Sequence, residues 1–221
     1  MRFLSALILA AAFAAMATAH FVYVVPAKDG KTVQVVMSEN LDPDDNVTMD
    51  KVNGLKLTAR LEDGKEVPVT HKAGPHALTA DVPAHAKLLH GTVIYGMLSR
   101  KDAKPALLVY HPKAILDGCD QKTATVGEKA ALEIVPVTAA GKTSFHVHGA
   151  GKPVADVELS VLLPDGKATK LKTDKDGKTE PVTGAGRYGI WARHIEPKAG
   201  EHDGKKYEEV RHYATLVVDL K

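Results

Sequence analysis

The 221-residue sequence contains one cysteine, Cys119, so it can form no disulfide within the chain and no cysteine-based zinc site. Aromatic residues make up only 5% of the chain, which is low for a platform that binds carbohydrate. The net charge is +2, with acidic and basic residues interspersed, and this pattern favours no nucleic-acid partner. After residue 20 no apolar run approaches the roughly 20 residues of a transmembrane helix, so we expect no transmembrane segment in the mature chain.

The sequence also lacks the motifs of common catalytic centres. It has no Gly-x-Ser-x-Gly, no phosphate-binding loop and no His-Glu-x-x-His. The acidic segment 42–46 lacks the glycine and the terminal glutamate of a calcium-binding EF-hand loop. We therefore expect a binding protein rather than an enzyme.

The first 19 residues have the pattern of a secretory signal peptide. Arg2 supplies the positive charge, residues 3–16 form the apolar run, and Ala17-Thr18-Ala19 fits a cleavage site with small residues. The pattern predicts export to the periplasm or secretion. Cleavage after Ala19 would make His20 the first residue of the mature protein.

An amino-terminal histidine has two metal-binding nitrogens on one residue, the α-amine and the imidazole. The α-amine has a reference pKa of about 7.7–8.0, so a metal ion can displace its proton near neutral pH. Histidine is abundant elsewhere too, with 11 residues in the chain. Together these features make His20 a candidate ligand for a divalent transition metal.

Short strands and tight turns dominate the rest of the sequence. Asp-Gly-Lys occurs five times, and Asp-Gly favours the centre of a type I′ hairpin turn, where both residues need positive φ. No helical periodicity extends over three turns after residue 19. The predicted strands cover residues 21–25, 32–37, 55–61, 93–98, 107–110, 132–137, 144–148, 157–163, 188–192 and 213–219.

These strands predict an all-β fold with two Ig-like or transthyretin-like β-sandwich domains. The polar segment 113–128 predicts the boundary between them. We assign residues 1–19 to the signal peptide, 20–115 to the N-terminal sandwich and 125–221 to the C-terminal sandwich. In the second half, Gly-Lys-Pro before a strand, an Asp-rich turn and a glycine before an aromatic strand resemble transthyretin-like or carboxypeptidase-regulatory-like sandwiches.

His194 and His212 flank a predicted hairpin with Asp203-Gly204 at its tip. A two-residue tip places His194 opposite Tyr213, whereas a shift of one residue places it opposite His212. Directly opposed Cβ atoms lie about 5 Å apart, which suits two imidazoles on one ion. Nearby carboxylates that could orient a ligand ring are Glu196, Glu208 and Glu209.

Three other histidines are second-tier candidates for metal ligands. His146 and His148 alternate in a predicted strand, so both rings project from one face, either toward a metal or toward solvent with Phe145 and Val147 inward. His111 precedes Pro112 at the end of a strand, near the domain boundary. The remaining histidines are predicted to be isolated surface residues in loops: His71, His76, His85, His90 and His202.

Several short motifs occur in a specific order: HFVYVVP at 20–26, LVYHPKA at 108–114, LEIVP at 132–136, GKP at 151–153, ARH at 192–194 and EVRHYATL at 209–216. In this order they resemble a large bacterial family of exported proteins of unknown function, associated with nickel or cobalt uptake. The resemblance implies a periplasmic metal-handling protein with His20, His194 and His212 as its ligands. A membrane metal transporter is the partner that it implies.

The leading hypothesis is an exported metal-binding protein for nickel, cobalt or copper. His20 would supply its amine and one ring nitrogen, and His194 and His212 one nitrogen each. Such a site suits Ni²⁺ or Cu²⁺, and it also accommodates Co²⁺ or Zn²⁺. Two alternatives remain open: a structural or carbohydrate-binding β-sandwich module, and a mononuclear copper oxidase with a histidine brace.

Overall fold

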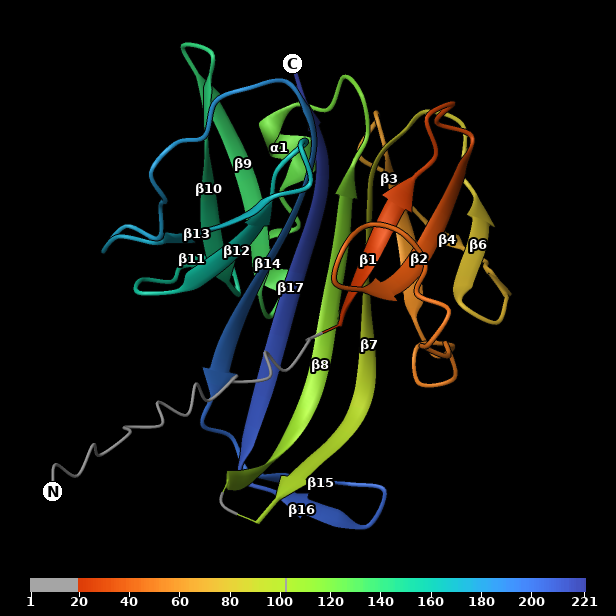
Figure 1. Cartoon of the computed structure of the whole chain (residues 1–221), viewed down its shortest axis with the longest axis vertical. Helices are drawn as coiled ribbons and strands as arrows, with labels where there is room; N and C mark the ends of the chain where they lie inside the picture. The colour runs from red at the N-terminus through yellow and green to blue at the C-terminus, as the bar shows by residue number, and fades with distance from the viewer. Residues whose placement is uncertain (1–19, 102) are drawn as a thin grey trace, which may run out of the picture.

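The computed structural model describes residues 20–101 and 103–221, and nearly all of its regular structure is β-strand (Figure 1). This confirms the predicted all-β fold. The predicted signal peptide, residues 1–19, lies outside the described residues. Within the described part, no helix is long and apolar enough to cross a membrane.

An eight-stranded sheet runs through the molecule and takes strands from both halves of the chain. In spatial order its strands are β13 (Ala168–Lys172), β12 (Glu158–Leu162), β14 (Gly186–Glu196), β17 (Glu209–Leu220), β8 (Ala103–Ile115), β7 (Ala86–Arg100), β3 (Lys56–Leu61) and β4 (Glu66–Val69). The halves meet where β8 pairs in parallel with β17, and Figure 1 shows these two strands side by side in the middle of the molecule.

A four-stranded sheet covers one face of this central sheet. In spatial order it consists of β1 (Phe21–Pro26), β2 (Thr32–Ser38), β6 (Ala77–Asp81) and β5 (Lys72–Ala73). Tyr110 and Ala114 of β8 and Val217 of β17 pack into its core. Nearly every side chain of β1 is buried, and each fully buried valine contributes about 1.5–3 kcal/mol through the hydrophobic effect.

A three-stranded sheet covers the opposite face. It consists of β11 (Lys152–Pro153), β10 (Lys142–Gly149) and β9 (Glu133–Ala139). Its core combines side chains of this sheet with those of β14 and β17: Ile134, Phe145, Val147, Ala192, Ala214 and Leu216. Successive residues of β17 therefore alternate between the two cores, which places the two covering sheets on opposite faces of the central sheet.

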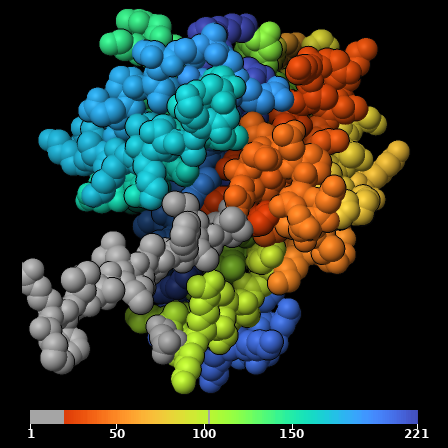
Figure 2. Space-filling model, viewed as in Figure 1, coloured from red at the N-terminus to blue at the C-terminus, as the bar shows by residue number. Residues whose placement is uncertain are grey.

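Each predicted domain thus supplies its own covering sheet, and both share the central sheet. The segment between β8 and β9 contains the short helix α1 (Gln121–Ala124) and the 3-10 turn η1 (Gly127–Lys129). At the far end, the hairpin β15 (Gly200–His202) and β16 (Lys205–Tyr207) extends with the β7–β8 tip beyond both covering sheets (Figures 1 and 2).

All five Asp-Gly-Lys tripeptides have their glycine at positive φ. Asp203-Gly204 has both residues at positive φ, as a type I′ turn requires, but the type I′ prediction is wrong at the other four. At Gly64 the turn is a three-residue loop, in which the N–H of Gly64 donates to the Leu61 carbonyl and the N–H of Leu61 donates to the Lys65 carbonyl. The Asp63 carboxylate also accepts the Lys65 N–H at 2.9 Å, so the aspartate stabilises the turn.

Two of these glycines allow a matched test of the turn geometry. A Cβ atom at Gly64 (φ +83°) would meet nothing within 4 Å, so Gly64→Ala carries only the backbone penalty of about 1 kcal/mol. A Cβ atom at Gly177 (φ +73°) would lie 3.0 Å from Pro153 Cβ, Val147 O and Val154 N. We expect Gly177→Ala to lower the free energy of unfolding by about 2–3 kcal/mol, measured by urea denaturation. Equal losses in the two variants would contradict this account.

Candidate metal site at a histidine cluster

Three histidines from three neighbouring strands lie on one face of the central sheet. His194 of β14 is the direct cross-strand partner of His212 of β17, as the shifted hairpin register predicts. His111 lies on β8, which pairs in parallel with β17. On β14 and β17 the next residues on this face, Ala192 and Ala214, are fully buried in the core beneath the three-stranded sheet. The three histidines therefore lie just beyond the edge of that covering sheet.

The rings of His111 and His212 are in direct contact, although the residues are 101 positions apart in the chain. His111 Nε2 lies 3.0 Å from His212 Nδ1, and the ring centroids are 5.2 Å apart. Each ring also has an oxygen partner at its other nitrogen. His212 Nε2 lies 3.1 Å from Glu196 Oε2, and His111 Nδ1 lies 3.3 Å from Thr92 Oγ1.

The surroundings lower the pKa values of two of these histidines, His111 and His194. The pKa of His111 is lowered to about 3, mainly by burial and to a smaller extent by the neighbouring His212. The pKa of His194 is also lowered, first by burial and then by His212, against the opposing effect of Glu196. At neutral pH both rings are therefore in the neutral form, which is the form that binds metal ions.

The geometry of the cluster allows two arrangements of its protons. In the first, one ring donates an N–H to the other across the 3.0 Å contact. In the second, His212 donates its Nε2–H to Glu196 and His111 donates its Nδ1–H to Thr92, which leaves a lone pair on each of the two facing nitrogens. Nitrogens bound about 2.1 Å from one ion at a right angle lie about 3.0 Å apart, so the second arrangement fits a shared ion. An oxygen partner on the outer nitrogen is the usual way in which proteins orient a metal-binding histidine.

The cluster supplies two facing nitrogens but not a complete site. Within residues 20–101 and 103–221, no three histidine, cysteine, aspartate or glutamate side chains are grouped so that they could hold a metal ion. An ion bound here would need further ligands, from His194 in another rotamer or from a small molecule.

The structure does not bring His20 to this cluster. His20 Nε2 forms an ion pair with Asp44 Oδ2 at 2.7 Å. The next residue, Phe21, stacks on Trp191 with ring centroids 3.9 Å apart and packs against Tyr213. By strand alternation, Trp191 and Tyr213 lie on the opposite face of the sheet from the three histidines. The predicted convergence of His20 with His194 and His212 is therefore absent, because β1 belongs to the sheet that covers the other face.

His146 and His148 form a separate pair on the outer face of β10. Phe145 and Val147 point inward and are fully buried, as one of the two sequence readings predicts. The two rings lie 6.3 Å apart between centroids, and His146 Nε2 contacts Ser144 Oγ at 3.2 Å. Neither ring takes part in the contacts of the His111–His212 cluster.

The sequence identifies one of the two residues that orient the cluster, Glu196, but not the other, Thr92. Glu196 is one of the three carboxylates proposed for this role. Thr92 gives no sequence signal, because its contact with His111 depends on how β7 pairs with β8 around a bulge. His90, predicted as a surface loop residue, instead lies within β7 with a buried Nε2 atom, so that prediction is wrong.

A buried ion pair lies beside the cluster on the same face of β8. Lys113 Nζ lies 2.8 Å from Glu133 Oε2 and also donates to the Ala124 carbonyl at 3.1 Å. Glu133 accepts the backbone N–H groups of Val126 and Gly127 as well. Burial lowers the pKa of Lys113, although Glu133 acts in the opposite direction. Burial also acts to raise the pKa of Glu133, but Lys113 and the two N–H groups together outweigh it, so the pKa of Glu133 is lowered. The pair ties the segment between α1 and β9 to the central sheet.

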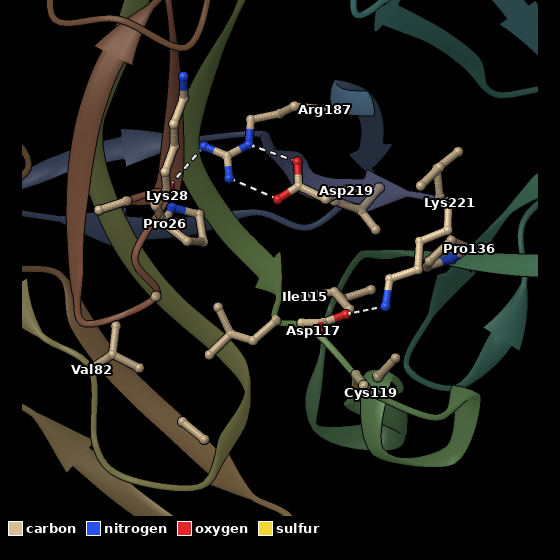
Figure 3. Close-up of a pocket in the computed structure, with 18 of the residues that line it drawn as sticks. Pro26, Lys28, Val82, Ile115, Asp117, Cys119, Pro136, Arg187, Asp219 and Lys221 are labelled. Carbon is tan, nitrogen blue, oxygen red and sulfur yellow. Dashed lines mark hydrogen bonds and ion pairs between the residues drawn. The ribbon is translucent and has the colours of Figure 1, made fainter. Parts of the chain in front are cut away.

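A larger cleft than the one beside the histidines lies between the two covering sheets near the ends of β8 and β17, and has a volume of about 1,280 Å³ (Figure 3). Four of its charged side chains form two ion pairs: Arg187 makes two hydrogen bonds to Asp219, and Lys221 pairs with Asp117. Lys28 and Lys31 also line the cleft. Cys119 lines the cleft, and burial followed by Asp120 raises the pKa of its thiol to about 11, which disfavours the reactive thiolate. The chemistry of the histidine cluster is therefore the better candidate for function.

The chain matches no protein-family model and no curated protein.

Proposed function

We propose that this protein is an exported protein that binds a divalent transition metal at the facing nitrogens of His111 and His212. Ni²⁺, Cu²⁺, Co²⁺ and Zn²⁺ all accept neutral imidazole ligands. Export rests on the signal-peptide pattern of residues 1–19, and a membrane metal transporter is the proposed partner. His194, opposite His212, is the proposed third ligand.

The observation that carries the proposal is the 3.0 Å contact between one ring nitrogen of His111 and one of His212, while the other nitrogen of each ring faces an oxygen. In the metal-free protein, Thr92, His111, His212 and Glu196 can form one hydrogen-bonded chain through these contacts. When an ion takes the two facing nitrogens, the same two oxygens would orient both rings as ligands.

His20 is proposed as a separate site rather than part of the cluster. Its Nε2 contacts Asp44, and its Nδ1 makes no hydrogen bond to the part of the chain that the structure describes. In a mature chain that begins at His20, the α-amine and Nδ1 could chelate an ion together. This second site depends on cleavage after Ala19, whereas the His111–His212 site does not.

The test is isothermal titration calorimetry of the metal-free protein that begins at His20, with Ni²⁺, Cu²⁺, Co²⁺ and Zn²⁺ in turn. We expect His111→Gln or His212→Gln to weaken binding of the preferred ion by about 100-fold, because each variant removes one of the two facing ring nitrogens. Glu196→Gln should weaken it by about tenfold, because it removes the carboxylate that orients His212. A form with one extra residue before His20 should keep its affinity at the cluster.

The matched control is His85→Asn. His85 has a side chain that is 71% exposed and a backbone φ of 63°, which asparagine tolerates better than most residues. It should bind metal as the wild type does. If His111→Gln and His212→Gln also bind as the wild type does, the cluster is not the site. If the wild type binds none of the four ions, the alternative of a structural or carbohydrate-binding module gains support.

A further inference from the structure

A small pocket opens on the same face of the central sheet, on the other side of His111 from His212. It has a volume of about 250 Å³ and lies between β3, β7, β8 and the segment 126–133. His111 and Thr92 form part of its wall, and His90, Lys56, Lys113 and Lys129 complete the polar lining. The volume is below the roughly 300–1,000 Å³ of pockets for drug-sized ligands, so it suits a molecule of only a few heavy atoms.

The lining of this pocket carries an excess of positive charge. Glu133 is its only acidic residue, and that carboxylate is already held by Lys113 and two backbone N–H groups. Lys129 lies 3.6 Å from Glu66, which is itself engaged by Arg60 at 2.7 Å. Lys56 has no ion-pair partner among the described residues. Lys56 is thus available to a ligand, and Lys129 shares a carboxylate that Arg60 holds more closely.

The wall also contains His90, whose Nε2 atom is buried. This atom lies 3.4 Å from Glu66 Oε1 and makes no well-aligned hydrogen bond within the described residues. Burial lowers the pKa of His90, and Arg60 and Lys113 add to that effect against Glu66. A negative charge in the pocket would act against these effects and favour the protonated form of the ring.

We infer that this pocket binds a small carboxylate anion through Lys56 and Lys129, beside the His90 ring. The two lysines supply ammonium groups for the carboxylate oxygens, and His90 responds to the charge of the bound anion. The site stands on its own charges and its own cavity, so it does not depend on metal binding at the neighbouring cluster.

The test uses metal-free protein and succinate as the probe, with calorimetry for affinity and NMR for the His90 ring. We expect succinate to bind and to raise the pKa of His90. The double variant Lys56→Gln/Lys129→Gln should weaken binding by about tenfold or more. The matched control, Lys205→Gln/Lys206→Gln, removes the same charge from the exposed strand β16 and should bind as the wild type does.

Three results would overturn the inference: no binding of succinate to the wild type, equal loss in the two double variants, or an unchanged pKa of His90 when succinate is bound. Inorganic phosphate serves as the competing oxyanion, and binding as tight as that of succinate would overturn the preference for a carboxylate. The His90 measurement uses the wild type and so does not depend on whether a variant folds. Since no metal is present, failure here leaves the calorimetry of His111→Gln and His212→Gln unaffected.

Discussion

Replacing Lys113 with methionine lowers the free energy of unfolding by about 3–5 kcal/mol, the largest stability effect that we expect from a single substitution in this protein. Methionine fills a similar volume, but Glu133 is then left as a buried carboxylate without its cation. The Ala124 carbonyl also loses the ammonium group that donates to it. Guanidinium denaturation at pH 7 measures the loss.

The control for this prediction is the double variant Lys113→Met/Glu133→Gln. It removes both charges, but its single glutamine oxygen can accept only one of the two N–H groups, those of Val126 and Gly127, that the two carboxylate oxygens of Glu133 accept. We expect it to recover part of the lost stability, because a buried ion pair gains little over a neutral replacement and one N–H group loses its acceptor. Lys170→Gln, which breaks an exposed pair with Glu158, should change stability by less than about 1 kcal/mol. A similarly small change in Lys113→Met would refute the argument.

Acidification should destabilise the metal-free protein well before its carboxylates are protonated. The folded pKa of His111, about 3, lies below the unfolded value of about 6.5, so below pH 6.5 the unfolded chain binds the extra proton. The stability due to neutral His111 is complete above pH 6.5 and is lost as the pH falls toward 3. The expected slope is about 1.4 kcal/mol per pH unit, or about 3 kcal/mol by pH 4.

Denaturation curves at pH 7.5, 6.5, 5.5 and 4.5 measure this slope. Because glutamine does not titrate, His111→Gln should show a shallower slope over the same range, whereas the exposed-site variant His85→Asn should keep the slope of the wild type. The pKa values of His90 and His194 are lowered in the same direction, first by burial, so some slope should persist in His111→Gln. Identical slopes in the wild type and His111→Gln would show that His111 is not held neutral by burial.

Local patterns in the sequence predicted much of the strand structure. Alternating apolar residues identified most strands of both cores, and Asp-Gly pairs marked the turns. The hairpin argument named the pairing of His194 with His212 as one of two registers. The two-residue turn at Asp203-Gly204 alone predicts His194 opposite Tyr213, and the observed pairing results from a shift of one residue between β15–β16 and β14–β17. The same argument also named Glu196, which lies two residues after His194 on the same face.

The remaining contacts of the site depend on which strands of the two halves pair with each other. The alternation of apolar and polar residues contains no information about that pairing. His111 contacts His212 only because β8 pairs in parallel with β17. Lys113 meets Glu133 only because the segment after β8 folds back on the central sheet. His20 was expected at the cluster because an amino-terminal histidine can chelate a metal ion and because of the family resemblance. The sequence shows that a strand begins there, but not which face of the sheet that strand covers.

The parallel pairing of β8 with β17 has a consequence for how the molecule is assembled. Neither sandwich can complete its shared sheet until two segments a hundred or so residues apart have found each other, and such long-range pairing is slow compared with the closing of local hairpins. Until β17 arrives, β8 presents an open edge with unpaired backbone groups, the kind of surface on which chains aggregate. The strand that brings His212 to His111, β17, is therefore also the strand whose pairing removes the edge at which aggregation during folding is most favoured.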